Sequence, residues 1–199
     1  MITFLTSTIN FFFLLTPFFV LSLFLEICKS KNERESKKIA FKTTFYILFI
    51  CLFILFFGQT IFKMIGITLI AFQIGSGLIL LLSGISMMKD KEIKMRPLLN
   101  NDDPSLIPLT LPITVGPGTI GALFVHGAKL AFDIKTVMLV SGIFAAVFLI
   151  WCLLYFSKYI YKLIGENGLD ILSKLTGLFL SIIAIQSILN GITSFILGL

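Results

Sequence analysis

The chain has 199 residues, of which 57% are hydrophobic and only 13% are charged, and its mean hydropathy is +1.05. A soluble domain of this length cannot bury so much apolar surface, so these values exclude a soluble fold and predict an integral membrane protein. The formal net charge of +6 is spread over several connections, which argues against a nucleic-acid-binding surface.

Six segments without formal charge follow one another along the chain, at 1–25, 43–62, 64–88, 104–128, 136–157 and 175–199. Each has at least 20 residues, enough to cross about 30 Å of hydrocarbon as a helix. The first segment lacks the basic start and the small-residue cleavage site of a signal peptide, so we expect it to be retained. The sequence therefore predicts an all-α integral membrane protein with six transmembrane helices.

The basic residues are concentrated in every second connection. The connections after the first, third and fifth segments carry 13 of the 16 Lys and Arg residues, and the others are Lys63, Lys129 and Lys135. By the positive-inside rule, these three connections are expected in the cytoplasm and both termini outside it. We therefore expect a multi-pass protein of the cell inner (cytoplasmic) membrane.

The first and fourth segments share a proline in a weak internal repeat. At an offset of 100 residues Pro17 falls on Pro117, and Gly77 falls on Gly177. Three spans per copy is an odd number, so the second copy would be inverted, as in many secondary transporters. We expect two repeats, residues 1–100 and 101–199, in one membrane domain, with the first and fourth spans meeting near the midplane. A duplication kept only for packing is the alternative.

The fourth segment contains the stretch LPITVGPGTIGALF at 111–124. A continuous helix here is disfavoured by Pro108, Pro112, Gly116, Pro117 and Gly118. Backbone groups freed by such a break cannot face lipid and need protein, water or a ligand. A half-helix beginning near Gly118 or Thr119 would present amide groups to an anion, and the carbonyls before the break would suit a cation or an ammonium group. An amino acid is complementary to both.

Polar side chains near the breaks complete the candidate site. Hydroxyl groups of Thr16 and Thr119 stand beside the two breaks and either cap backbone or contact substrate. Gln73, Gln186 and Asn190 lie inside spans, where lipid exposure is costly, so we expect them to face the bundle interior, as interhelical contacts or as substrate ligands. The candidate substrate-binding residues are therefore Thr16, Pro17, Gln73, Gly116, Pro117, Gly118, Thr119 and Gln186.

Small residues also mark the third and sixth spans. Gly177, Ser181 and Ala184 share one helix face, as do Gly77 and Gly84, which predicts close helix packing. The sequence contains no HExxH, no GxSxG and no phosphate-binding glycine loop followed by lysine. We therefore expect no enzymatic activity, no cofactor and no catalytic or metal site.

Three stretches resemble the MarC family of six-span inner-membrane proteins. These are PLTLPITVGPGTIGALF at 108–124, FGQTIFKMIGITLIAFQIGSGLILLLSGISMM at 57–88 and GENGLDILSKLTGLFLSIIAIQSILNGI at 165–192. The family is similar in organisation to LysE-type amino-acid exporters, and some members are reported as transporters of small neutral amino acids. The resemblance implies discontinuous first and fourth spans and substrates the size of glycine or alanine. The first span departs from the family pattern, because Phe19 and Ser22 stand where a glycine and a second proline are usual.

The function expected from these features is membrane transport of small neutral amino acids or similar small metabolites, bound between the broken first and fourth spans. The alternative is a channel-like or structural membrane protein without solute transport. The expected partners are a small solute and membrane lipid, with no nucleic acid. The sequence leaves the choice between a monomer and a homo-oligomer open.

Overall fold

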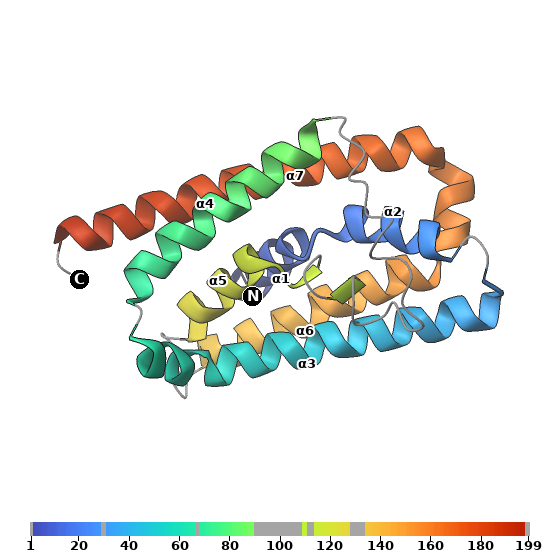
Figure 1. The fold of residues 1–199 in the computed structure, drawn as a ribbon. Helices are drawn as coiled ribbons and strands as arrows, with labels where there is room; N and C mark the ends of the chain where they lie inside the picture. Colours follow the sequence, from blue (N-terminus) through green and yellow to red (C-terminus); the bar gives the residue numbers. More distant parts are fainter. Residues whose placement is uncertain are drawn as a thin grey trace.

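The computed structural model describes residues 2–28, 31–66, 68–89, 109–110, 114–127 and 134–197. The helices in these residues are α1 (Ile2–Leu14), α2 (Pro17–Ile27), α3 (Glu33–Ile65), α4 (Leu69–Met88), α5 (Pro117–Gly127), α6 (Ile134–Tyr155) and α7 (Ser157–Leu197) (Figure 1). The described residues contain no strand. The predicted all-α class is confirmed.

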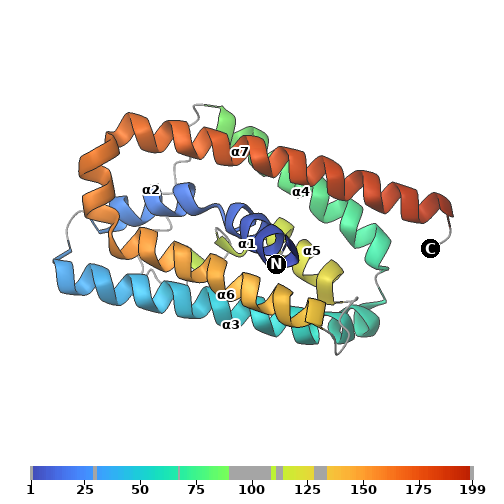
Figure 2. The same cartoon turned by 180° about the vertical axis from the view of Figure 1, so that it is seen from behind.

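The helices form two outer pairs with shorter helices between them. Helices α3 and α6 lie side by side, and α4 packs along α7 on the other side of the molecule (Figures 1 and 2). Between the pairs, α1 packs on α6, while α5 contacts both α3 and α4. The buried core includes Phe11, Phe24, Ile47, Leu123 and Ile150. Each of the short inner helices thus contributes to the core that joins the two pairs.

Four helices are long and apolar enough to cross a membrane: Glu33–Gly58 within α3, Ile70–Met88 within α4, α6 and α7. A fifth span results if α1 and α2, which meet at a 44° bend, are counted together. The fourth predicted span is represented in the described residues by α5, with 11 residues, and by residues 109–110 and 114–116 before it. The integral membrane class is supported, while the count of six spans stays a prediction.

Helix α3 shows how the hydrophobic residues divide between lipid and core. Phe41, Phe45, Phe49 and Phe53 recur every four residues and are exposed, which places them on one face of the helix. Ile47 is fully buried on the other side. A broad apolar exposed face of this kind is expected against lipid and not against water.

Two of the basic connections are partly helical, although their charge alone suggests loops. Helix α3 begins at Glu33, ten residues before its uncharged segment. Its start is a reciprocal cap, because the Glu35 amide donates to Asn32 Oδ1 at 2.9 Å and the Asn32 amide donates to Glu35 Oε2 at 3.3 Å. The connection after the fifth segment is also helical, as the start of α7, with a kink at Gly165 where φ is 66°.

The small-residue faces of α4 and α7 pack closely, as predicted, and they pack against each other. A Cβ atom on Gly84 would lie 2.6 Å from the Gly177 carbonyl oxygen, and one on Gly177 would lie 2.6 Å from the Gly84 carbonyl oxygen. The Ser181 hydroxyl is folded back onto the Gly177 carbonyl at 2.9 Å. The two backbones are therefore in direct contact at a crossing that admits no larger side chain.

Several sequence predictions concern residues outside the described ranges. These are the prolines Pro108 and Pro112, the basic connection after the third span, and the boundary between the two predicted repeats at residues 100 and 101. The described parts of the two halves do share one feature. Helices α2 and α5 each have 11 residues and begin at the prolines matched by the repeat, Pro17 and Pro117.

Candidate functional site

The first break separates α1 from α2 at Leu15 and Thr16. Pro17 is the first residue of α2 and has no amide hydrogen to donate to the preceding turn. The turn closes instead through the Thr16 amide, which donates to the Phe13 carbonyl at 3.0 Å, and α2 resumes with Val20 donating to the Thr16 carbonyl at 3.0 Å. The break predicted from Pro17 is therefore present.

Thr16 has an unusual backbone conformation at this break. Its φ of 47° and ψ of 55° lie in the left-handed helical region, and it is the one non-glycine residue with positive φ among those described. Pro17 disfavours the right-handed helical conformation at the residue before it. A β-branched residue in the left-handed region is strained by about 1–3 kcal/mol, and such strain is often located at functional sites.

The second break precedes α5. The Val115 amide donates to the Thr110 carbonyl at 2.8 Å, and the Ile120 amide donates to the Gly116 carbonyl at 2.9 Å. Residues 109–110 and 114 are π-helical, and residues 115 and 116 are not helical, before α5 begins at Pro117. The break predicted in the fourth span is thus present in the part of it that the structure describes.

A side-chain hydrogen bond joins the two breaks. The Thr119 hydroxyl, in the first turn of α5, donates to the Leu14 carbonyl at the end of α1 over 2.9 Å, and the Thr114 carbonyl oxygen is 3.3 Å away. Thr119 is only 2% exposed. The Leu14 carbonyl is one of the acceptors left at the end of α1 by the break. The two breaks are therefore in contact, as expected, with Thr119 capping backbone, while their position near the midplane stays a prediction.

The two short helices lead away from this junction in opposite directions. Helix α2 runs toward the end of the molecule where α3 begins, and α5 runs toward the other end (Figures 1 and 2). At the far end of α5, a Cβ atom on Gly127 would lie 2.5 Å from the Leu55 carbonyl oxygen in the second half of α3. The first turns of both helices, with their positive dipole ends, consequently lie near the junction.

The glycines of α5 allow this helix to pack closely against α4. A Cβ atom on Gly118 would lie 2.3 Å from Leu80 Cδ1 and 2.9 Å from Leu80 Cβ, and one on Gly121 would lie 2.3 Å from the Ser76 hydroxyl oxygen. A side chain of α4 thus packs directly against Gly118. Gly118 sets the distance between α4 and the second break, whether or not it also contacts a substrate.

Thr16 also carries the one unpaired hydroxyl next to the junction. Among the described residues, the buried side-chain oxygens without a hydrogen-bond partner are Thr16 Oγ1 and Thr43 Oγ1. Thr43 belongs to α3, and its carbonyl accepts a hydrogen bond from Thr110 Oγ1 at 3.3 Å. Buried polar groups are nearly always paired, so an unpaired hydroxyl beside a helix break indicates a position for water or a ligand.

The two glutamines have different environments. Gln73 in α4 is half-buried, and its backbone carbonyl accepts a hydrogen bond from the Ser187 hydroxyl of α7 at 3.5 Å. Gln186 and Asn190 are exposed on α7, so the expected interior location is wrong for both. Gln186 is two residues beyond Ala184, which faces α4, and lies about 200° around the helix from it. The Gln186 amide instead donates to Asn190 Oδ1 at 3.5 Å, one turn away.

The junction also contains residues that the sequence did not single out. Thr114 is fully buried, and its hydroxyl donates to the Leu109 carbonyl at 2.6 Å. Leu80 closes the junction from α4. Thr114 lay within the quoted proline and glycine stretch and could have been found as a third hydroxyl near the break, whereas nothing in the sequence of α4 pointed to Leu80.

Comparison with known proteins gives a single answer. A sequence profile described as "MarC family integral membrane protein" matches residues 1–196. The chain belongs to the MarC family. The prediction made from the three quoted stretches is confirmed, and the junction between Leu14 and Thr119 is a feature of a MarC-family protein.

Relatives in the MarC family are named only as membrane proteins. A UPF0056 membrane protein of Aquifex aeolicus (strain VF5) is 27% identical over 198 residues, covering 96% of this chain and 92% of the relative. A UPF0056 membrane protein of Methanocaldococcus jannaschii is 31% identical over 189 residues, covering 92% of each chain. The UPF0056 inner membrane protein MarC of Escherichia coli is 28% identical over 201 residues, covering 92% of this chain and 90% of the relative. No solved structure matches the chain.

Proposed function

We propose that this protein transports small neutral amino acids, or metabolites of similar size, across the inner membrane without catalysing a reaction. The observation that carries the proposal is the junction of two helix breaks, joined by the Thr119 hydroxyl and the Leu14 carbonyl. Discontinuous helices that meet inside a membrane are the common form of substrate site in secondary transporters.

The chemistry of the junction suits a small zwitterion. The first turns of α2 and α5 begin at prolines, and the amides that follow offer donors to a carboxylate, assisted by the helix dipoles. The unpaired Thr16 hydroxyl supplies a further donor or acceptor. Leu80 and Ser76 lie close against α5, and such close packing favours a substrate with a short side chain, such as glycine or alanine.

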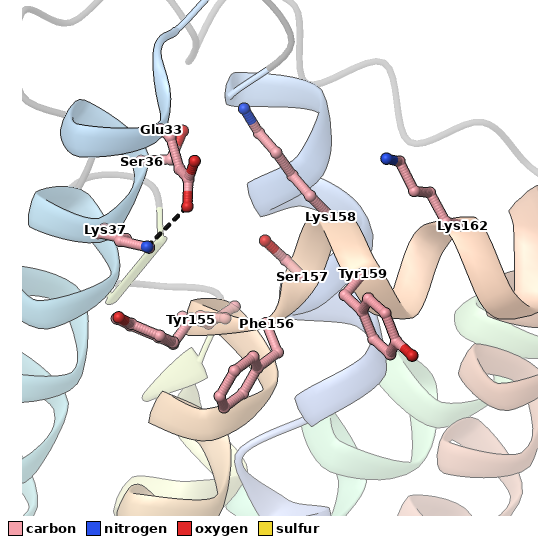
Figure 3. Close-up of a pocket in the computed structure, with 10 residues that line it drawn as sticks. Glu33, Ser36, Lys37, Tyr155, Phe156, Ser157, Lys158, Tyr159 and Lys162 are labelled. Carbon is pink, nitrogen blue, oxygen red and sulfur yellow. Dashed lines mark ion pairs between the residues drawn. The ribbon is translucent and has the colours of Figure 1, made fainter.

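The distribution of charge supports an orientation for this transporter. Lys37, in the connection after the first segment, and Lys158 and Lys162, in the connection after the fifth, line one pocket (Figure 3). This pocket lies at the end of the molecule where α3 begins and α6 meets α7 (Figure 1). By the positive-inside rule, this end faces the cytoplasm and both termini lie outside it. Inner-membrane localisation is part of the proposal and agrees with the name of the Escherichia coli relative.

Transport is tested by reconstituting the purified protein into liposomes and measuring counterflow of labelled glycine, alanine and serine. We expect saturable flux for at least one of the three, above that of protein-free liposomes. Saturation separates a binding site from a channel-like pore. The absence of saturable flux for all three amino acids and for a wider panel of small metabolites would contradict the proposal and favour a structural role.

A Thr119→Val variant tests the junction directly. Valine keeps the shape of the side chain but leaves the Leu14 carbonyl without its donor, which costs about 1–3 kcal/mol at a buried site. We expect a lower thermal midpoint in detergent and a several-fold loss of flux. Thr119→Ser is the matched control, because it retains the hydroxyl. It should keep most of the thermal stability and most of the flux. Equal behaviour of the valine and wild-type proteins would show that the bond has no role.

A further inference from the structure

A second polar site lies at the basic end of the molecule, where α3 and α7 begin and α6 ends. A pocket of about 340 Å³ is formed there by the first turns of α3, the last residues of α6 and the first turns of α7 (Figure 3). It is separate from the junction of Leu14 and Thr119, and the proposed transport does not use it.

The pocket has an excess of positive charge. The Glu33 carboxylate is paired with Lys37 Nζ at 2.6 Å, and the same Nζ lies 4.8 Å from the centre of the Tyr155 ring. Lys158 and Lys162 are one turn apart on α7, and neither forms an ion pair within 4.0 Å with a described carboxylate. Two cations of the pocket wall are therefore available to an anion from outside the protein.

The hydroxyl of a largely buried serine points into the same pocket. Ser157, the first residue of α7, is only 3% exposed, and no hydrogen bond of its side chain is present among the described residues. Its oxygen is directed toward the space beside Glu33 and Lys37 (Figure 3). The neighbouring Ser36, in contrast, donates to the Asn32 carbonyl at 2.9 Å. A hydroxyl that opens into a pocket without a protein partner is positioned to bind water or a ligand, and the first turn of a helix favours an anionic one.

The position of the pocket decides what kind of anion suits it. The apolar span of α6 ends at Tyr155, and the aromatic residues beyond it, Phe156 and Tyr159, are 53% and 71% exposed. Aromatic side chains of this kind are typical of the membrane–water interface. An anion held beside them lies at the depth of lipid headgroups, with apolar surface next to it for the upper part of an acyl chain.

We propose that this pocket binds the phosphate group of an anionic membrane lipid. Lys158 and Lys162 neutralise the phosphate, the Ser157 hydroxyl donates a hydrogen bond to it, and Phe156 and Tyr159 contact the glycerol and the first acyl carbons. Such a lipid would hold the beginnings of α3 and α7 together at the basic end of the protein.

Native mass spectrometry of the full-length protein in detergent tests the proposal, with phosphatidylglycerol and phosphatidylcholine added at equal concentration. We expect the wild-type protein to retain phosphatidylglycerol in preference. The double variant Lys158→Gln/Lys162→Gln should retain at least about tenfold less, since each lysine contributes to attraction of an anionic headgroup. Both lysines are exposed, so folding is not at risk. Ser157→Ala should lower retention by a smaller factor, about threefold.

Lys135→Gln is the matched control, because it removes one positive charge at the opposite end of α6 and should leave lipid retention unchanged. Equal retention of the two lipids by the wild-type protein would overturn the proposal, as would unchanged retention by the double lysine variant. Loss of phosphatidylglycerol in millimolar inorganic phosphate would assign the site to a soluble anion instead. If the double lysine variant lost lipid but Ser157→Ala retained it fully, the binding would be general electrostatic attraction, and the proposed site would be wrong.

Discussion

A Gly84→Leu variant is expected to fail to assemble the α4–α7 pair. A Cβ atom at this position meets the Gly177 carbonyl oxygen at 2.6 Å and the Ser181 amide nitrogen at 3.0 Å. Both are backbone atoms, so no rotamer change can make room, and the helices must separate. We expect a loss of about 3 kcal/mol in the free energy of unfolding. The measurement is the thermal midpoint of the purified protein in detergent, followed by circular dichroism and size exclusion.

Gly75→Leu is the matched control in the same helix. No atom lies within 4 Å of a Cβ placed on Gly75, and the residue is exposed. Because leucine forms helix more readily than glycine by almost 1 kcal/mol, this variant should be as stable as the wild type or slightly more stable. If the variants at Gly84 and Gly75 had the same midpoint, the direct backbone contact between α4 and α7 would be wrong.

A Gly118→Leu variant is expected to abolish transport. The new side chain would collide with Leu80 of α4, since even its Cβ would lie 2.3 Å from Leu80 Cδ1. Helix α5 would be displaced, and with it the Thr119 hydroxyl that holds the Leu14 carbonyl. A displacement of about 1 Å at a binding site is enough to reduce function by two orders of magnitude. The contact with Leu80 also adds an expected loss of stability.

Two comparisons separate the loss of transport from a loss of folding. Gly75→Leu, reconstituted in the same way, should transport at the wild-type rate. Gly118→Ala adds only the Cβ atom that collides with Leu80. A second substitution, Leu80→Ala, removes the Cδ1 and Cγ atoms that account for most of this collision. We expect the double variant to transport faster than Gly118→Ala alone. Full transport by Gly118→Leu would show that the junction is not the substrate site.

Local features of the sequence predicted the breaks well. Proline lacks an amide hydrogen wherever it stands, so Pro17 and Pro117 interrupt their helices before any tertiary contact is considered. The facing glycines of α4 and α7 were also predictable, because a small-residue stripe in a membrane helix has few other uses than packing. The helical extension of α3 back to Glu33 was missed, although Asn32 and Glu35 have the spacing of a capping box.

Gln186 shows where such reasoning fails. The rule that polar groups in membranes face the interior assumes that they have no local partner, and Asn190 one turn away supplies one. The positions of Gln186 and Asn190 around the helix are set by the stripe of Gly177, Ser181 and Ala184, which must face α4. The gain from close helix packing therefore outweighed the preference of two amide groups for the interior.

The sequence by itself determined that this chain is a helical membrane protein of the MarC family with helices interrupted at Pro17 and Pro117, because composition, covalent structure and motifs act locally. Only the tertiary structure decided how the freed groups are paired. Thr119 reaches the Leu14 carbonyl across 105 residues of chain, and Leu80 meets Gly118. These partners depend on how helices pack around one another, which no single segment specifies.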